Sequence, residues 1–150
     1  MSIRSRLLTG ALAAVSALAL ITTTAPSASA ATYTGGNGST PSTCAGSYVG
    51  GKVARDSAQR VILRLEVFYS SAKSGTNCAI LYNNTGKRIP MQLKVESRDF
   101  KNYAIDTGNY VSYAGRVAIS GTAKKSINIW AGATYQGKYY SLDMPGSFGN

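Results

Sequence analysis

The chain has 150 residues and a formal net charge of +10, from 16 Lys and Arg against six Asp and Glu. It contains no histidine and only two cysteines. Without an imidazole, the Ser-His-Asp and Cys-His catalytic arrangements and histidine-based metal sites are excluded. The positive charge favours polyanionic surroundings such as wall polymers, nucleic acid or acidic membrane surfaces, with solubility alone as the alternative reason for it.

Residues 1–30 have the pattern of an export signal. Two arginines precede an uncharged run at 7–21, whose helix would rise roughly 22 Å, less than the roughly 30 Å hydrocarbon core of a bilayer. The small residues at 28–30 fit the pattern that a signal peptidase accepts, so we expect cleavage after Ala30. An uncleaved anchor is the alternative. We therefore expect a secreted protein with no transmembrane anchor after signal removal.

The exported part is the size of one domain. Its 120 residues keep 14 of the 16 cationic residues and all six carboxylates, which gives a net charge of +8. Residues 31–43 contain one bulky side chain, Tyr33, and too little apolar surface to offset the entropy lost on ordering. We predict a flexible leader over residues 31–43 and a single β-domain over residues 44–150.

Cys44 and Cys78 both lie in the exported part. In an oxidising compartment two cysteines most simply form one disulfide. Closing this loop would stabilise the domain by roughly 3–4 kcal/mol on the chain-entropy model. A metal site is the alternative, but two thiolates would need further ligands and the chain has no histidine to provide them.

Apolar and polar side chains alternate in several segments. In residues 60–69, for example, Leu63, Leu65 and Val67 share one face of an extended chain. Further candidate strands lie at 77–82, 91–98, 110–120 and 126–133, and a hairpin around 134–140 would close near Gln136-Gly137. A short helix at 57–65 is the alternative that its β-branched content disfavours. We predict an all-β fold, a small antiparallel β-sandwich or barrel of about six to eight short strands with one disulfide.

The carboxylates give little indication of an active site. Three of them lie near cations on or beside predicted strands: Glu66 with Arg64, Glu96 with Lys94, and Asp99 with Arg98. Cross-strand ion pairing explains these better than a glycosidase pair. Asp106 begins an Asp-Thr-Gly segment that is similar to an aspartic-protease turn, but the partner half is missing. A serine–lysine dyad stays open, and we predict no enzyme activity, no catalytic residues, no metal and no cofactor.

Aromatic and basic residues gather late in the chain. Ile127 and Ile129 alternate with Trp130, so Trp130 is partly exposed if the isoleucines face the core. Aromatic faces stack on sugars or bases while neighbouring cations contact phosphates. We predict a binding surface made of Lys124, Lys125, Trp130, Tyr135 and Lys138. The alternative is that these rings pack a β-core.

Four segments carry a family resemblance: Cys-Ala-Gly-Ser-Tyr at 44–48, Ser-Gly-Thr-Asn-Cys at 74–78, Asp-Thr-Gly-Asn-Tyr-Val-Ser-Tyr-Ala-Gly at 106–115, and Ile-Trp-Ala-Gly at 129–132. Together they resemble the spore-associated protein A family, small secreted proteins of filamentous actinobacteria. The resemblance implies export, a small β-domain and association with the cell or spore exterior, but no catalytic residues. Family members often have a second cysteine pair near the tryptophan, where this chain has Ser126.

We predict a secreted, non-enzymatic protein of the cell or spore surface that attaches to wall or spore-coat polyanions through its basic surface. The alternative is a carbohydrate- or protein-binding module, such as an inhibitor or antagonist, that uses the late Tyr and Trp residues. An unrecognised hydrolase is a third possibility. Salt separates the first two, because charge-driven attachment weakens with ionic strength whereas aromatic stacking changes little. Nucleic acid is not an expected partner in vivo, and the oligomeric state is left open.

Overall fold

The computed structural model describes residues 30–148, and all of their regular structure is β. Eleven strands occur in this range: β1 (Ala31–Gly35), β2 (Gly38–Ser39), β3 (Ser47–Arg55), β4 (Val61–Ser70), β5 (Thr76–Asn83), β6 (Ile89–Ser97), β7 (Tyr103–Tyr110), β8 (Tyr113–Ser120), β9 (Ile127–Tyr135), β10 (Lys138–Ser141) and β11 (Met144–Ser147). None of the described residues belongs to a helix long and apolar enough to cross a membrane. The predicted export signal lies outside the described residues except for Ala30.

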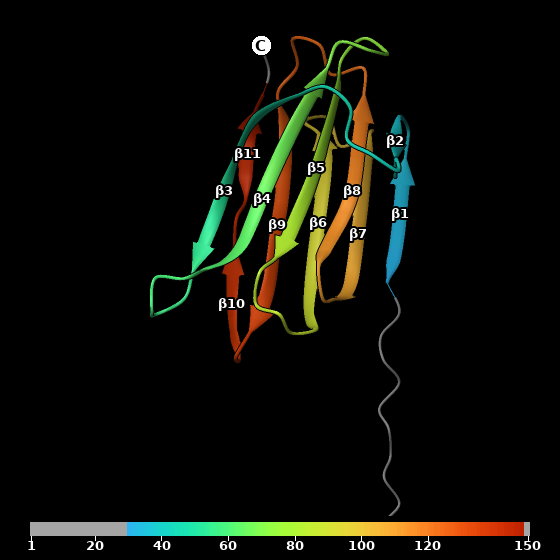
Figure 1. The fold of residues 1–150 in the computed structure, drawn as a ribbon. Coiled ribbons are helices and arrows are strands. Elements are labelled where there is room, and N and C mark those ends of the chain that lie inside the picture. The colour runs from blue at the N-terminus through green and yellow to red at the C-terminus, as the bar shows by residue number, and fades with distance from the viewer. Residues whose placement is uncertain (1–29, 149–150) are drawn as a thin grey trace, which may run out of the picture.

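The strands form two antiparallel sheets that pack face to face (Figure 1). Sheet A has the order β1-β7-β6-β9-β10, with β11 also paired to β9, and sheet B has the order β2-β8-β5-β4-β3. The sheets do not close into a barrel, so the sandwich prediction is confirmed and the barrel alternative is excluded. The strands outnumber the predicted six to eight because β1, β2, β3, β7 and β11 occupy segments in which the sequence pattern did not predict a strand.

The prediction of a flexible leader over residues 31–43 is wrong for residues 31–39, which form β1, β2 and the turn between them. Strand β1 pairs with β7, from Ala31 opposite Thr107 onward, while β2 pairs with β8. An open sheet edge offers backbone hydrogen bonds to any extended segment, so this pairing needs no large side chains. Residues 40–43 form no strand, so this part of the predicted leader is a loop.

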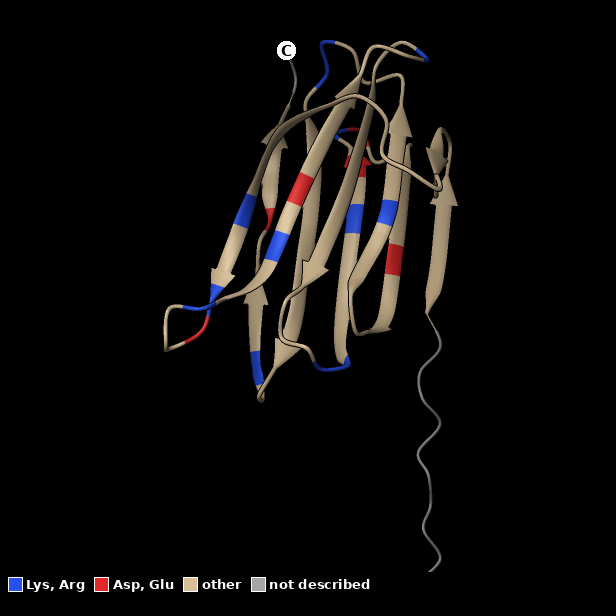
Figure 2. Cartoon of the chain, viewed as in Figure 1, with Lys and Arg blue, Asp and Glu red and all other residues tan. Residues whose placement is uncertain are grey.

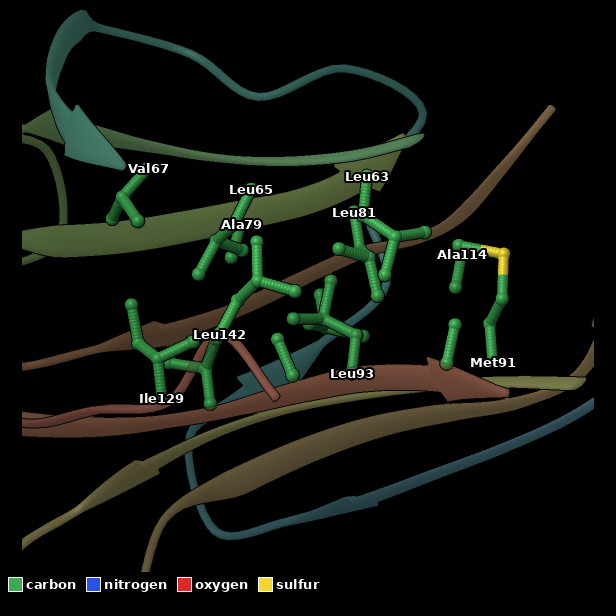
Figure 3. Packing of buried hydrophobic residues seen from close by; sticks show 14 of the residues in the cluster. Leu63, Leu65, Val67, Ala79, Leu81, Met91, Leu93, Ala114, Ile129 and Leu142 are labelled. Atoms are coloured by element: carbon green, nitrogen blue, oxygen red, sulfur yellow. The ribbon is translucent and has the colours of Figure 1, made fainter. Parts of the chain in front are cut away.

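One apolar core fills the space between the sheets (Figure 3). Leu63, Leu65 and Val67 of β4 are at most 1% exposed, so they face inward as the alternation predicts. Sheet A contributes Leu93 and Ile129, which are completely buried. Burying each such side chain stabilises the fold by roughly 1.5–3 kcal/mol, so a one-residue shift of any central strand would be costly.

Residues 40–46 cross the outer face of sheet B from β2 at one edge to β3 at the other (Figure 1). Cys44 in this crossing is bonded to Cys78 of β5, and their Cα atoms are 5.5 Å apart. The predicted disulfide is confirmed. It holds the crossing against the middle strand of the sheet.

The predicted hairpin around Gln136 and Gly137 is also confirmed. Tyr135 lies opposite Lys138, and the two residues between them have φ values of 50° and 75°. Positive φ at both central residues is the geometry of a type I′ turn, whose twist matches that of the strands. This turn brings Tyr139 back alongside β9.

Candidate polyanion-binding site

The connections between strands gather at two opposite ends of the sandwich (Figure 1). The end drawn uppermost, called the upper end, contains the connections 36–37, 71–75, 98–102 and 121–126. The lower end contains the connections 56–60, 84–88, 111–112 and 136–137. Lysine and arginine residues occur at both ends and on the strands, as Figure 2 shows.

The cations of the upper end are exposed and lack partners. They are Lys73, Arg98, Lys101, Lys124 and Lys125. Within residues 30–148, none of these side chains forms an ion pair or donates a hydrogen bond. Their positive charge is therefore available to a ligand.

Within residues 30–148 the upper end contains one carboxylate, Asp99. It accepts hydrogen bonds from the Ser97 hydroxyl (2.5 Å) and from the backbone N–H of Lys101 (3.2 Å). These bonds, that of Ser97 above all, hold the pKa of Asp99 below its ordinary value because they stabilise the charged form, and the positive charge of nearby Lys101 lowers it further. The hydrogen bonds to this carboxylate thus come from neutral donors, and Arg98 forms no ion pair with it.

The lower end has the same composition of charges, in Arg55, Arg60, Lys87, Arg88, Lys138 and Asp56. Here, however, Arg60 forms an ion pair with Asp56 at 2.7 Å. The hydrogen bond from Arg60 lowers the pKa of Asp56. The Arg55 guanidinium donates to the backbone carbonyl of Gln59 (2.8 Å).

Two further cations of the lower end have partners within the protein. Arg88 donates to the backbone carbonyl of Asn109 (3.1 Å). The Lys138 ammonium lies 5.0 Å from the centre of the Tyr140 ring, within the range of a cation–π interaction. In the part of the chain that the structure describes, Lys87 is the one cation of this end whose side chain has no such contact.

The remaining cations lie along the strands and are engaged there. Arg64 pairs with Glu66 and lies over the Tyr82 ring, Lys94 pairs with Glu96, Arg116 lies over the Tyr113 ring, and Lys52 donates to the Asp143 carbonyl. Glu66 and Glu96 therefore do form ion pairs, but each pairs with a residue two positions away on its own strand. The prediction was wrong in expecting them across strands. It was also wrong for Asp99, which forms no ion pair within residues 30–148.

Backbone hydrogen bonds join the connections of the upper end to one another. The N–H groups of Gly121 and Ala123 donate to the carbonyls of Lys73 and Ser74, at 3.1 and 2.9 Å. These bonds tie the β8–β9 connection to the β4–β5 connection. Their cations therefore project from a braced surface, which reduces the entropy lost when a ligand is bound.

Buried and bridging side chains brace the same end. The Thr122 hydroxyl is buried, accepts a hydrogen bond from the Asn77 amide (2.8 Å) and donates to the Gly75 carbonyl (3.1 Å). The Asn102 side chain accepts a hydrogen bond from the backbone of Asn37 (2.9 Å), which links the β6–β7 connection to the β1–β2 turn. All four connections of the upper end thus have a partner in another segment.

Two polar hollows open between these connections. One, of about 390 Å³, is lined by Arg98, Lys124 and Lys125 together with Ser97, Asp99, Asn102, Gly121, Thr122 and Ser126. The other, of about 450 Å³, is lined by Asn37, Gly38, Ser39, Lys73, Ser74 and Ser120. Cationic groups beside hydroxyls and amides suit phosphate or carboxylate groups, because hydrogen bonds between charged donors and charged acceptors are the stronger ones.

The residues of the predicted binding surface are divided among three places. Lys124 and Lys125 lie at the upper end and Lys138 at the lower end. Trp130 lies on the outer face of sheet A, 37% exposed and opposite the isoleucines as predicted, and Tyr135 packs against the core. Strand β9 has nine residues and spans roughly 26 Å, so these groups do not form one surface.

Asp106, the carboxylate of the Asp-Thr-Gly segment, is buried and serves the fold. It accepts hydrogen bonds from the Tyr110 hydroxyl and the Gly115 N–H, which connects β7 to β8. Burial and the contact with Asp106 raise the pKa of Tyr110 well above its ordinary value. Among residues 30–148 there is no cluster of three or more His, Cys, Asp or Glu side chains suited to a metal ion.

Sequence reasoning did not identify Lys73, Arg98 and Lys101. A usable signal was present, because in consecutive antiparallel hairpins every second connection lies at the same end. Applying that rule requires every strand to be counted, and β7 was not predicted as a separate strand. If β7 is left out of the count, the rule places Lys124 at the opposite end from Lys73.

The chain matches no known family model, and no curated protein or solved structure matches it. The resemblance to the spore-associated protein A family therefore stays a prediction from the segments that suggest it.

Proposed function

We propose that this is a secreted, non-enzymatic protein of the cell or spore surface that binds anionic wall or coat polymers through its upper end. The observation that carries the proposal is the set of five exposed cations without partners on the braced connections of that end. A polymer with phosphate or carboxylate groups would meet several of these cations at once. Export rests on the pattern of residues 1–30 alone.

The carboxylates support a non-enzymatic role. Each of the six has a hydrogen-bond or ion-pair partner in the protein: Asp56, Glu66, Glu96, Asp99, Asp106 and Asp143. A general acid or base must be within reach of a substrate proton. Carboxylates committed to structural partners are poor candidates for that task.

The test is sedimentation of the purified protein with isolated cell walls or spores, and binding to inorganic polyphosphate, across a series of salt concentrations. Electrostatic attachment should be tight at low salt and should weaken steeply as salt rises, because exposed charges are screened. Binding that does not change with salt would contradict the proposal, as would the absence of binding at every salt concentration.

A matched pair of variants locates the binding surface. Lys124→Gln with Lys125→Gln removes two cations from the upper end, whereas Lys87→Gln with Lys138→Gln removes two exposed lysines from the lower end. Both proteins have the same net charge. We expect the upper pair to weaken polyphosphate binding roughly tenfold more than the lower pair. Equal losses would show that overall charge, and not the upper end, is responsible.

A further inference from the structure

A third hollow lies on the outer face of sheet A, away from the cations of the upper end. It has a volume of about 420 Å³, within the range of roughly 300–1,000 Å³ that is typical of small-ligand pockets. It extends over three neighbouring strands, with Thr107 on β7, Gln92 on β6 and Thr134 on β9, and Tyr139 of β10 borders it. No residue that lines it is charged.

The Tyr139 ring is held in place above the sheet. Gly132 lies beneath it, and a Cβ at that position would come within 2.2 Å of the Tyr139 hydroxyl oxygen. Only glycine therefore allows the ring to lie this close to the strand. The Gln92 amide of β6 donates a hydrogen bond to the same hydroxyl (2.8 Å) across β9 and fixes the ring. Even so, Tyr139 remains 51% exposed, so it is a fixed aromatic surface open to solvent.

Trp130 flanks the hollow, two residues before Gly132 on the same face of β9. Its indole N–H donates to the Glu96 carboxylate at 2.6 Å, which fixes the ring. Glu96 is only 2% exposed and pairs with Lys94. The charges beneath Trp130 therefore cancel, and its immediate surroundings offer an aromatic ring without a net charge.

We propose that this hollow binds a neutral oligosaccharide. Sugar rings have apolar faces that stack on aromatic side chains, and hydroxyl groups that both donate and accept hydrogen bonds. Tyr139 and Trp130 supply the aromatic faces, and the amide and hydroxyl groups of Gln92, Thr107 and Thr134 supply donors and acceptors. An anionic ligand finds no cation among the lining residues. The site is separate from the upper end and does not depend on the proposed polyanion binding.

Trp130 is the only tryptophan in the chain, so its fluorescence reports directly on this face. The experiment titrates the purified protein with β-1,4-linked tetrasaccharides of glucose and of N-acetylglucosamine, at low and at high salt. We expect a saturable change in fluorescence with at least one of them and the same affinity at both salt concentrations. The absence of a saturable change with either sugar at millimolar concentration overturns the proposal. An affinity that disappears at high salt would also overturn the proposal.

Variants separate this site from the rest of the surface. Tyr139→Ala should weaken sugar binding roughly tenfold, because it removes one stacking ring, and Gln92→Ala should weaken it less. Tyr33→Ala is the matched control, since Tyr33 is similarly exposed (56%) but lies on β1, outside the hollow. Thermal unfolding of each variant verifies that it is folded. Equal affinities in Tyr139→Ala and Tyr33→Ala would overturn the proposal.

Discussion

The two ends of the sandwich carry equal charge but differ in how many of their charged side chains form contacts within the protein. Among the residues that the structure describes, each has five cations and one carboxylate. At the lower end Arg60 and Asp56 neutralise each other and most other cations contact carbonyls or a ring. At the upper end the cations have no such partners among residues 30–148, and Asp99 is held by a serine hydroxyl.

The difference shows that net charge alone does not locate a binding surface. Cations that already contact their own chain contribute to its stability and must exchange those contacts to bind a ligand. Cations without partners need no such exchange. The two ends therefore differ in whether their cationic side chains have partners within the protein. The following experiments test this difference in order of decreasing effect.

The disulfide constrains the upper part of the sandwich and has no counterpart at the lower end. Replacing Cys44 and Cys78 together by alanine should lower the free energy of unfolding by about 3–4 kcal/mol, because the loop between them is no longer closed in the unfolded state. Urea unfolding of the oxidised protein and the variant measures the change. A loss below about 1 kcal/mol would show that the crossing is held mainly by packing.

The Thr122 hydroxyl is expected to contribute more to stability and to polyphosphate binding than the Thr85 hydroxyl at the lower end. Thr122→Val keeps the shape but leaves the buried Asn77 amide without its acceptor, which should cost about 1–3 kcal/mol in unfolding free energy. The same change should weaken polyphosphate binding, since it loosens the connections that carry the lysines. Thr85→Val is the control, because the Thr85 hydroxyl contacts Asn83 in a more exposed turn. Equal effects of the two changes on binding would contradict the difference between the ends.

The single carboxylates offer a finer comparison. Asp99→Asn removes the one negative charge beside the unpartnered cations and should tighten polyphosphate binding roughly two- to fivefold. Asp56→Asn removes one negative charge from the lower end in the same way, and it leaves Arg60 without its ion-pair partner. Binding measured at low salt should improve less in that variant. A larger gain from Asp56→Asn would reverse the assignment of the binding end.

Much of the fold could be predicted because alternation and cysteine count are local signals. The inward face of β4 and the bond between Cys44 and Cys78 follow from them. Strand β7 could not be predicted from the sequence, because Asp106 and Gly108 interrupt its apolar pattern. Asp106 is tolerated inside only because Tyr110 and Gly115 donate to it, and such contacts are set by the tertiary fold.

The candidate site was harder to predict from the sequence than the fold was. Lys124 and Lys125 could be recognised as cations, but whether a cation is paired depends on neighbours distant in the sequence. Strand β1 is a similar case, since its small side chains give no apolar pattern and its order comes from the backbone of β7. Backbone pairing and ion pairing across the fold are the two kinds of information that the sequence pattern lacked.

Acid should destabilise the protein through both ends. The pKa values of Asp56 and Asp99 lie below their ordinary value of 3.8 in the folded state, so the unfolded state binds protons first as the pH falls. Their contribution to stability is complete above roughly pH 5 and is lost as the pH falls through the folded pKa values. Thermal unfolding between roughly pH 6 and pH 2 measures this loss, which Asp56→Asn and Asp99→Asn should each reduce.

Salt distinguishes the two contributions. The pKa of Asp56 is lowered mainly by a charged guanidinium, whereas that of Asp99 is lowered mainly by the neutral Ser97 hydroxyl. Screening acts on interactions between exposed charges and leaves a hydrogen bond to a hydroxyl largely unchanged. Added salt should therefore diminish the part of the acid response that Asp56→Asn removes, and should preserve the part that Asp99→Asn removes. If salt diminished both parts equally, Asp99 would owe its low pKa to the surrounding cations, and those cations would be less available to a ligand than we infer.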